Sequence, residues 1–302
     1  MTEGTITIES WRARGKNLST HDGEIWWLDT RASAADVVSK ADATPVCILH
    51  GFPTSSHDFS RFVELVAPRR VITLDFLGFG LSDKPTEFGY SIFEHADAVI
   101  AVLRAAKVER AHIFAHDLGT SVATELCARR ERGQLPFDLA SLTLMNGSVH
   151  IELADLTFGQ LMLRSPLGPV FAKLNNARTF KAQMKRIFAR PVSETDLDAM
   201  WALLARADGP LRLPQTIRYI EERSRFRRRW IGALERLDRP TLVAWGRLDP
   251  VAVIAIARQL ASEIPNAELS IWDDLGHYPQ VEAPEVVAST VVPFWDRIDS
   301  KT

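Results

Sequence analysis

RAHIFAHDLGTSVA, residues 110–123, predicts a short buried strand, a sharp turn and then a helix. This is the arrangement of a nucleophile elbow, in which small residues such as Ala115 and Gly119 let the strand and the helix approach closely. The turn presents one side chain beyond the end of the sheet, and here that side chain is the carboxylate of Asp117. A carboxylate nucleophile forms an alkyl ester by attacking carbon, so this residue favours an epoxide or alkyl halide over an ester or peptide.

Short apolar runs on both sides of this stretch predict further buried parallel strands. Strands are expected at residues 45–50, 70–76, 110–116, 139–146, 240–245 and 268–272, and helices at 90–107, 120–130, 251–264 and 284–298. An antiparallel strand pair is expected ahead of them, at residues 5–14 and 23–31. The elements predict an α/β fold with a mostly parallel, doubly wound sheet covered by helices on both faces.

Residues 150–237 interrupt this alternation, because they have helical apolar spacing, scattered prolines and glycines, and no clear buried strand. We expect an inserted helical cap at 150–237 and a core at 1–149 and 238–302. A cap of this kind would close over Asp117 and exclude water, whereas the alternative is a helical appendage without a catalytic part. Its apolar segment 156–174 is expected to pack in the interior, with a substrate tunnel or a partner contact as alternatives.

Two later loops supply the residue types that a hydrolytic triad needs. Asp249 lies in GRLDP, residues 246–250, directly after a predicted strand, and His277 lies in LGHYP, residues 275–279. The chain order is therefore nucleophile, acid, histidine. In this arrangement His277 takes a proton from water, while Asp249 fixes the tautomer of the imidazole and stabilises its charged form.

The loop after the third predicted strand is a candidate oxyanion hole. HGFP, residues 50–53, places the peptide N–H of Phe52 at the end of that strand, and Leu118 follows the nucleophile. Peptide N–H groups at these two positions stabilise the negative charge that develops when water attacks an acyl carbon. The alternative is a plain glycine-proline turn.

Composition excludes several classes of protein. The 302 residues are 46% hydrophobic, and 36 Lys and Arg against 38 Asp and Glu leave a net charge of -2, which argues against nucleic acid as a partner. Cys47 and Cys127 fall in predicted buried elements, and with no leader pattern or membrane span in the sequence the cytoplasm is expected. The histidines lack paired ligand spacing, so no metal is expected. Whether the chain forms a homodimer stays open.

Several motifs together resemble one known family. They are HGFPTSS at 50–56, DFLGFGLSDKP at 75–85, YSIFE at 90–94, HD at 116–117, FRRRWIGAL at 226–234, LDPV at 248–251 and HYPQVE at 277–282. The chain resembles the mesoderm-specific transcript family of α/β hydrolases, and more broadly the epoxide hydrolases and haloalkane dehalogenases. The resemblance implies the α/β-hydrolase fold, with Asp117 as nucleophile, Asp249 as acid and His277 as base.

The group that stabilises the leaving atom decides between the two electrophiles. Haloalkane dehalogenases typically hold halide with a tryptophan after the nucleophile and a tryptophan or asparagine in the loop after the third strand, whereas this chain has Leu118 and Phe52 there. Neither side chain can donate a hydrogen bond. Epoxide hydrolases donate from cap tyrosines, and Tyr219 is the one cap tyrosine, with packing as its alternative role.

The expected function is cofactor-independent hydrolysis of a small hydrophobic epoxide to a diol through an ester on Asp117. Dehalogenation of a haloalkane or haloacid is the alternative enzyme reaction, and a ligand-binding receptor on a hydrolase fold is the alternative without catalysis. Arg223, Arg225 and 227–229 form a basic run that is expected to lie on a solvated or core-docking helix. His116 is expected to position the elbow or to pack.

Overall fold

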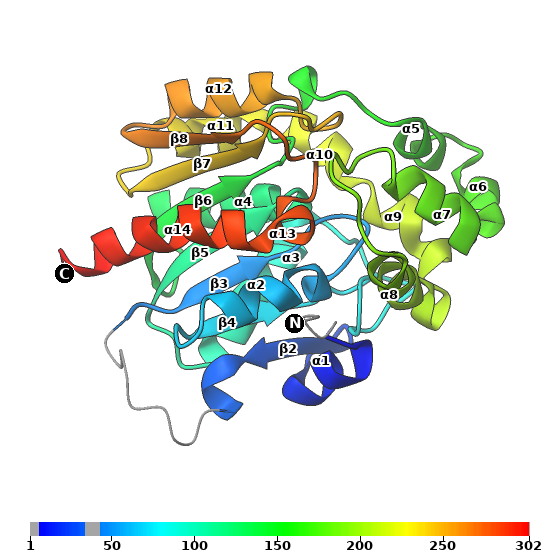
Figure 1. The fold of residues 1–302 in the computed structure, drawn as a ribbon, viewed down its shortest axis with the longest axis horizontal. Coiled ribbons are helices and arrows are strands. Elements are labelled where there is room, and N and C mark those ends of the chain that lie inside the picture. The colour runs from blue at the N-terminus through cyan, green and yellow to red at the C-terminus, as the bar shows by residue number, and fades with distance from the viewer. Residues whose placement is uncertain (1–5, 34–42, 302) are drawn as a thin grey trace.

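The computed structural model describes residues 6–33 and 43–301, in which a central sheet is covered by helices on both faces (Figure 1). The strands are β1 (Lys16–Ser19), β2 (Glu24–Asp29), β3 (Val46–Leu49), β4 (Val71–Leu74), β5 (Arg110–His116), β6 (Asp138–Met145), β7 (Thr241–Gly246) and β8 (Ala267–Trp272). They form one eight-stranded sheet in the order β1-β2-β4-β3-β5-β6-β7-β8. β2 pairs antiparallel with β1 and β4, and the other neighbours are parallel. The predicted mostly parallel α/β sheet is confirmed.

The helices of the core divide between the two faces because strand side chains alternate. These helices are α1 (Ile8–Arg14), α2 (Ser60–Leu65), α3 (Ile92–Ala105), α4 (Leu118–Glu131), α12 (Ile254–Glu263), α13 (Pro279–Glu282) and α14 (Pro284–Asp299). Val46 and Ile48 of β3 share a cluster with Trp295 of α14, whereas Cys47 and Leu49 share one with α3 and α4. All four residues of β3 are buried, as expected for a strand covered on both faces.

The first predicted strand, at residues 5–14, is wrong where the structure describes it. Residues 8–14 form α1, and the strand that pairs with β2 is β1. Thr7 begins the helix, since its side chain accepts a hydrogen bond from the Ser10 N–H at 3.2 Å. Trp11 is the buried residue of α1, and its ring lies 5.8 Å from that of Trp26. The alternating pattern that predicted a strand thus belongs to a capped helix held by one tryptophan.

The chain between β6 and β7 folds as short helices joined by turns and loops. It contains α5 (Phe158–Arg164), α6 (Gly168–Leu174), α7 (Ala177–Met184), α8 (Glu194–Ala205), α9 (Leu213–Thr216), α10 (Tyr219–Arg225) and α11 (Arg227–Glu235). Figure 1 shows α5 to α9 gathered beyond one end of the sheet. By contrast, α11 packs on α4 of the core, where the indole N–H of Trp230 donates to Glu125 at 2.9 Å. The division of the chain at residues 150 and 237 stays a prediction.

The apolar segment 156–174 is only partly internal, contrary to expectation. Leu163 and Ala172 are buried, but Phe158, Leu167 and Leu174 are largely exposed. Because α5 and α6 have only seven residues each, one face of each short helix contacts the remainder of the protein and the other stays in solvent. Within residues 6–33 and 43–301, no helix is long and apolar enough to cross a membrane.

Candidate active site

Asp117 occupies the predicted sharp turn between β5 and α4. Its backbone has φ 44° and ψ -110°, a left-handed region that costs free energy for a residue other than glycine. The N–H of Gly119 donates to the carbonyl of His50 at 3.0 Å, which draws α4 against the end of β3. A Cβ at Gly119 would lie 2.5 Å from the carbonyl oxygen of Leu49, so only glycine allows this close approach. The local sequence therefore places the carboxylate at the tip of the elbow.

The carboxylate of Asp117 meets the predicted oxyanion hole and one buried cation. The peptide N–H of Phe52 donates to Oδ2 at 2.9 Å, and Nη2 of Arg223 lies 3.9 Å from Oδ1. Leu118 begins α4 beside it, and among the described residues the structure records a hydrogen bond to this carboxylate from Phe52 but not from Leu118. Oδ1 is thus the oxygen without a hydrogen-bond donor in this set.

His277 and Asp249 form a buried pair at the ends of neighbouring strands. Nδ1 of His277 donates to Oδ2 of Asp249 at 2.7 Å. The other oxygen, Oδ1, accepts from the peptide N–H groups of Val251 at 2.7 Å and Ala252 at 2.9 Å. Because the carboxylate only accepts, this bond puts the imidazole proton on Nδ1 and leaves Nε2 able to take a proton.

Asn146 holds this pair in place and was not anticipated from the sequence. Its Nδ2 donates to Oδ2 of Asp249 at 2.7 Å and to the carbonyl of Gly276 at 3.2 Å, while its Oδ1 accepts from the N–H of Gly246 at 3.0 Å. Asn146 therefore connects the loop of the acid with the loop of the histidine. The signal available in the sequence was a polar residue at the end of a predicted buried strand. In the structure its φ is 45°, which asparagine tolerates.

The surroundings of His277 raise its pKa above the ordinary value of 6.5. Burial by itself lowers the pKa, but the charge of Asp249, the hydrogen bond to it and the charge of Asp117 together outweigh burial. The charged imidazole is thus favoured in the resting site. Its proton must leave before Nε2 can act as a base.

We expect His277 to titrate above pH 6.5 in the free protein, and hydrolysis to slow as the pH falls through that pKa, because only the neutral ring accepts a proton from water. Asp249→Asn removes the charge that contributes most to the rise, so the pKa should fall. NMR titration of the His277 ring in the two proteins measures both values. A wild-type pKa at or below 6.5, or an unchanged pKa in the variant, would contradict the expectation.

His116 connects the elbow with the loop of the catalytic histidine candidate, which supports its expected positioning role. Its Nε2–H donates to the carbonyl of His277 at 2.7 Å, and its Nδ1 accepts from Nε2 of Gln280 at 3.2 Å. Burial and the charge of His277 lower the pKa of His116 to about 4. The ring is therefore neutral, and its two hydrogen bonds fix the orientation of the loop that carries His277.

Tyr219 lies on α10 with its ring 5.8 Å from that of Phe52. The side chain is buried, and among the described residues its hydroxyl has no hydrogen-bond partner. Burial, and next the charge of Asp117, raise the pKa of Tyr219 well above its ordinary value. A buried hydroxyl without a partner is costly, so its presence calls for a role. Tyr219 remains a protonated donor beside the carboxylate.

The helix of Arg223 docks on the core, which is one of the two expectations for the basic run, but the complete burial of this side chain was not anticipated. The side chain is buried, and its Nε donates to the hydroxyl of Ser121 at 2.7 Å. Its Nη2 donates to the carbonyl of Asp117 at 3.4 Å, and its guanidinium lies 4.5 Å from the ring centre of Tyr219. Desolvation lowers the pKa of Arg223. A buried positive charge therefore lies against the elbow, 3.9 Å from the carboxylate of Asp117.

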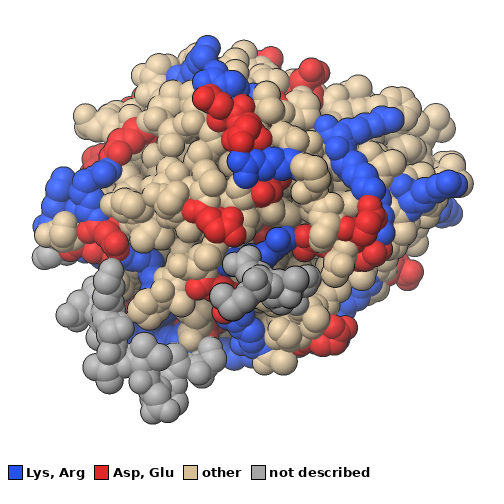
Figure 2. Space-filling view, in the orientation of Figure 1, with Lys and Arg blue, Asp and Glu red and all other residues tan. Residues whose placement is uncertain are grey.

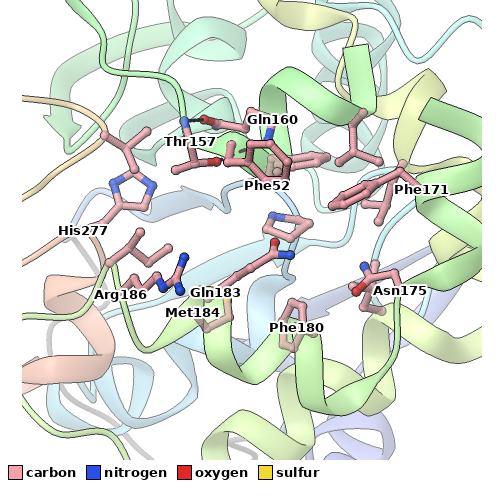
Figure 3. A pocket seen from close by; sticks show the side chains of 18 residues that line it. Phe52, Thr157, Gln160, Phe171, Asn175, Phe180, Gln183, Met184, Arg186 and His277 are labelled. Atoms are coloured by element: carbon pink, nitrogen blue, oxygen red, sulfur yellow. Dashed lines mark hydrogen bonds between the residues drawn. The ribbon is translucent and has the colours of Figure 1, made fainter. Parts of the chain in front are cut away.

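A mostly apolar cavity of about 220 Å³ lies between the helices after β6 and the core (Figure 3). Phe52 and His277 form its core side, and Phe171, Phe180 and Met184 are among the side chains opposite them. Asp117 and Tyr219 are not among its lining residues, although both contact Phe52, which is. The expected opening of the Asp117 carboxylate into a cavity is therefore not observed for this one. Within the described part of the chain, no three His, Cys, Asp or Glu side chains group as metal ligands.

The fold and this arrangement of side chains define a class of protein. The sequence model of the α/β hydrolase fold family matches residues 44–284. The chain belongs to the α/β hydrolase fold family, and the comparisons support a hydrolase of that superfamily.

Within the family, the chain is similar to LipZ of Mycobacterium tuberculosis, with 41% identity over 290 residues that cover 95% of this chain and 97% of LipZ. It is also 37% identical to the human mesoderm-specific transcript homolog protein over 289 residues, which cover 92% of this chain and 84% of that protein. The resemblance to mesoderm-specific transcript proteins is therefore supported. Haloalkane dehalogenase DbeA from Bradyrhizobium elkani matches with a TM-score of 0.80 and 22% identity over 95% of this chain and 99% of DbeA, a similarity that shows the fold alone.

Proposed function

We propose that the protein hydrolyses a small hydrophobic epoxide to a diol through a covalent alkyl ester on Asp117. The observation that carries the proposal is a carboxylate at the tip of the elbow, where acyl hydrolases need a hydroxyl or thiol. Attack by a carboxylate on an alkyl carbon gives an ester that water can cleave. The apolar cavity supports a small hydrophobic electrophile as the substrate.

In the first step, Oδ1 of Asp117 attacks a ring carbon of the epoxide. The substrate reaches Asp117 from the cavity, beside Phe52 and His277. The new bond joins Oδ1 to that carbon, while the bond between the carbon and the ring oxygen breaks. Tyr219 gives its proton to the departing oxygen, which becomes a hydroxyl. Its partnerless hydroxyl supports this role, as do its ring contacts with Phe52 and Arg223, which both reach Asp117. The product of the step is a hydroxyalkyl ester and a tyrosinate, which regains its proton from water.

In the second step, water attacks the carbonyl carbon of the ester and gives its proton to Nε2 of His277. The peptide N–H groups of Phe52 and Leu118 stabilise the oxyanion. Collapse of the tetrahedral intermediate breaks the acyl carbon–oxygen bond, and the proton held on Nε2 of His277 passes to the departing alkoxide, which releases the diol. Esterification removes the charge of Asp117, which contributes to the raised pKa of His277. The pKa of His277 therefore falls at the step that needs a neutral base.

We further propose that α5 to α9 act as a lid over this site. Phe171 of α6 and Phe180 and Met184 of α7 line the cavity opposite His277. Substrate then enters when these helices move, and water is excluded when they close.

Tyr219→Phe is the sharpest test of the epoxide assignment. We expect kcat for a reactive epoxide to fall about 10²-fold or more, because a general acid contributes that much to breaking a carbon–oxygen bond. The unfolding free energy should stay equal or rise slightly, since the hydroxyl that is removed has no partner. The measurements are diol formation by chromatography and chemical denaturation.

Tyr90→Phe is the matched control, because the Tyr90 hydroxyl donates to the carbonyl of Pro85 in the core. It should lose stability and keep activity. Undiminished diol formation in Tyr219→Phe would remove the acid role. Halide release from a haloalkane or haloacid, unaffected in that variant, would favour a dehalogenase, and a wild type inactive on both substrate panels would favour a binding protein.

A further inference from the structure

Large apolar side chains project into solvent from α5, α6 and the turn between them. The exposed fractions are 70% for Phe158, 51% for Leu161, 60% for Leu167, 57% for Val170 and 69% for Leu174. Phe158 and Leu161 are three residues apart on α5, and Val170 and Leu174 are four apart on α6, so each pair lies on one side of its helix. We call these five residues the α5–α6 apolar face. Contiguous exposed apolar surface of this kind marks an interaction site.

The charged residues of the chain segment that forms this face are all positive, and acidic partners come from other segments, such as Glu221 for Arg164. Residues 156–193 contain no Asp or Glu, although the whole chain has a net charge of -2. The basic residues of the segment are Arg164, Lys173, Arg178, Lys181, Lys185, Arg186 and Arg190. Figure 2 shows Lys and Arg side chains among uncharged surface and some Asp and Glu side chains on the right-hand part of the molecule, where Figure 1 places α5, α6 and α7. Apolar surface and positive charge therefore lie together.

The basic residues differ in how far their charges are neutralised. Lys181 and Lys185 pair with Glu194 of α8, and Arg190 pairs with Asp274. Lys173 at the end of α6 and Arg178 at the start of α7 are exposed, and the structure records no ion pair for either among the residues it describes. Arg186 is also exposed without a recorded ion pair among the described residues, but its side chain lines the cavity. Lys173 and Arg178 are therefore the charges that we assign to an external anionic surface.

The apolar face is continuous with the wall of the cavity. The rings of Phe158 and Phe171 lie 6.4 Å apart, and both side chains line the cavity that His277 also lines. A molecule that contacts the exposed part of Phe158 thus touches a residue of the cavity wall. An apolar compound that leaves a lipid phase at this face would reach the cavity without crossing water.

We propose that the α5–α6 apolar face docks on an anionic lipid bilayer, with its apolar side chains in the headgroup region and Lys173 and Arg178 against lipid charges. An anionic lipid surface matches both the exposed apolar side chains and the positive charges, since it offers an apolar interior and negatively charged headgroups. A second copy of the chain brings the same positive segment to a symmetric contact, so like charges oppose it. Entry of a lipophilic substrate from the bilayer rests on the proposed function; the docking itself does not.

Sedimentation with vesicles tests the docking without any turnover. The full chain is mixed with vesicles of phosphatidylcholine and phosphatidylserine, or of phosphatidylcholine alone. We expect the wild type to bind the vesicles that contain phosphatidylserine, and this binding should weaken as the salt concentration rises. In Phe158→Ser/Leu174→Ser the partition coefficient should fall about tenfold or more, because insertion of apolar side chains drives interfacial binding. In Lys173→Glu/Arg178→Glu the partition coefficient should fall about tenfold, and only on vesicles that contain phosphatidylserine.

Matched controls use exposed residues elsewhere. Leu65→Ser/Leu269→Ser changes two exposed leucines of α2 and β8, and Arg104→Glu/Arg258→Glu reverses two exposed charges of α3 and α12. Both controls should bind vesicles like the wild type. The proposal is overturned if the wild type does not bind anionic vesicles at low salt, or if controls and test variants bind equally. A wild-type dimer by light scattering that Phe158→Ser/Leu174→Ser dissociates, without vesicle binding, would assign the face to a second copy instead.

Discussion

His277→Gln is expected to stop turnover at the ester and to leave the protein covalently modified. The variant keeps Asp117 and its hydrogen bond from Phe52, so alkylation still proceeds, but no group at position 277 can take the proton from water. We expect kcat to fall at least about 10³-fold, the scale of losing the base from a triad.

Intact mass measurement after incubation with substrate identifies the electrophile. An epoxide adds its whole mass to the protein, whereas an alkyl halide adds its mass less that of the hydrogen halide. Peptide mapping should place the modification on Asp117. His21→Gln, at an exposed histidine outside the site, is the control and should turn over normally without an adduct. An unmodified His277→Gln protein, combined with an active wild type, contradicts the covalent mechanism.

Asp117→Asn is expected to remove both the adduct and the activity, with a loss of about 10⁴-fold or more, because the carboxamide is a poor nucleophile at alkyl carbon. The carboxamide oxygen can still accept from the N–H of Phe52, so the elbow should stay folded. The cation of Arg223, 3.9 Å from the lost charge, is then buried without its counter-ion, and we expect a modest fall in unfolding free energy.

Activity assays and chemical denaturation check this variant against Asp155→Asn, an exposed carboxylate between β6 and α5. The double variant Asp117→Asn/His277→Gln should show no adduct at all. Covalent labelling of that double variant would place the nucleophile elsewhere. Retained activity in Asp117→Asn, with the asparagine verified by mass, would end the proposed mechanism.

The elements nearest the site followed from local sequence. Ala115 and Gly119 on either side of Asp117 predicted the elbow, and the structure places Gly119 against the carbonyl of Leu49. Asp249 and His277 were expected as partners from chain order alone, and their side chains lie 2.7 Å apart. Such features are predictable because a tight turn demands small residues at fixed offsets and because parallel strands end at one edge of a sheet.

Other features depended on contacts between distant segments. Residues 8–14 alternate in polarity like a strand, but they form a helix because Thr7 caps it and Trp11 packs on Trp26. The basic run from Arg223 predicted a solvated or core-docking helix, but not that Arg223 is buried against Ser121 and the elbow. The segment 156–174 suggested an interior, yet much of it meets solvent. The polarity of a side chain favours burial or exposure, but it does not specify which residues the side chain contacts.

The sequence by itself determined the α/β sheet, the tip of the elbow and the order of the acid and base candidates, because strand periodicity and turn geometry are local properties of the backbone. Only the tertiary structure decided that Asn146 joins the loops of Asp249 and His277, that Arg223 lies against the elbow and that the hydroxyl of Tyr219 has no partner among the described residues. Those relations arise when segments far apart in the chain exclude water from one another, and no local pattern encodes which polar groups then meet.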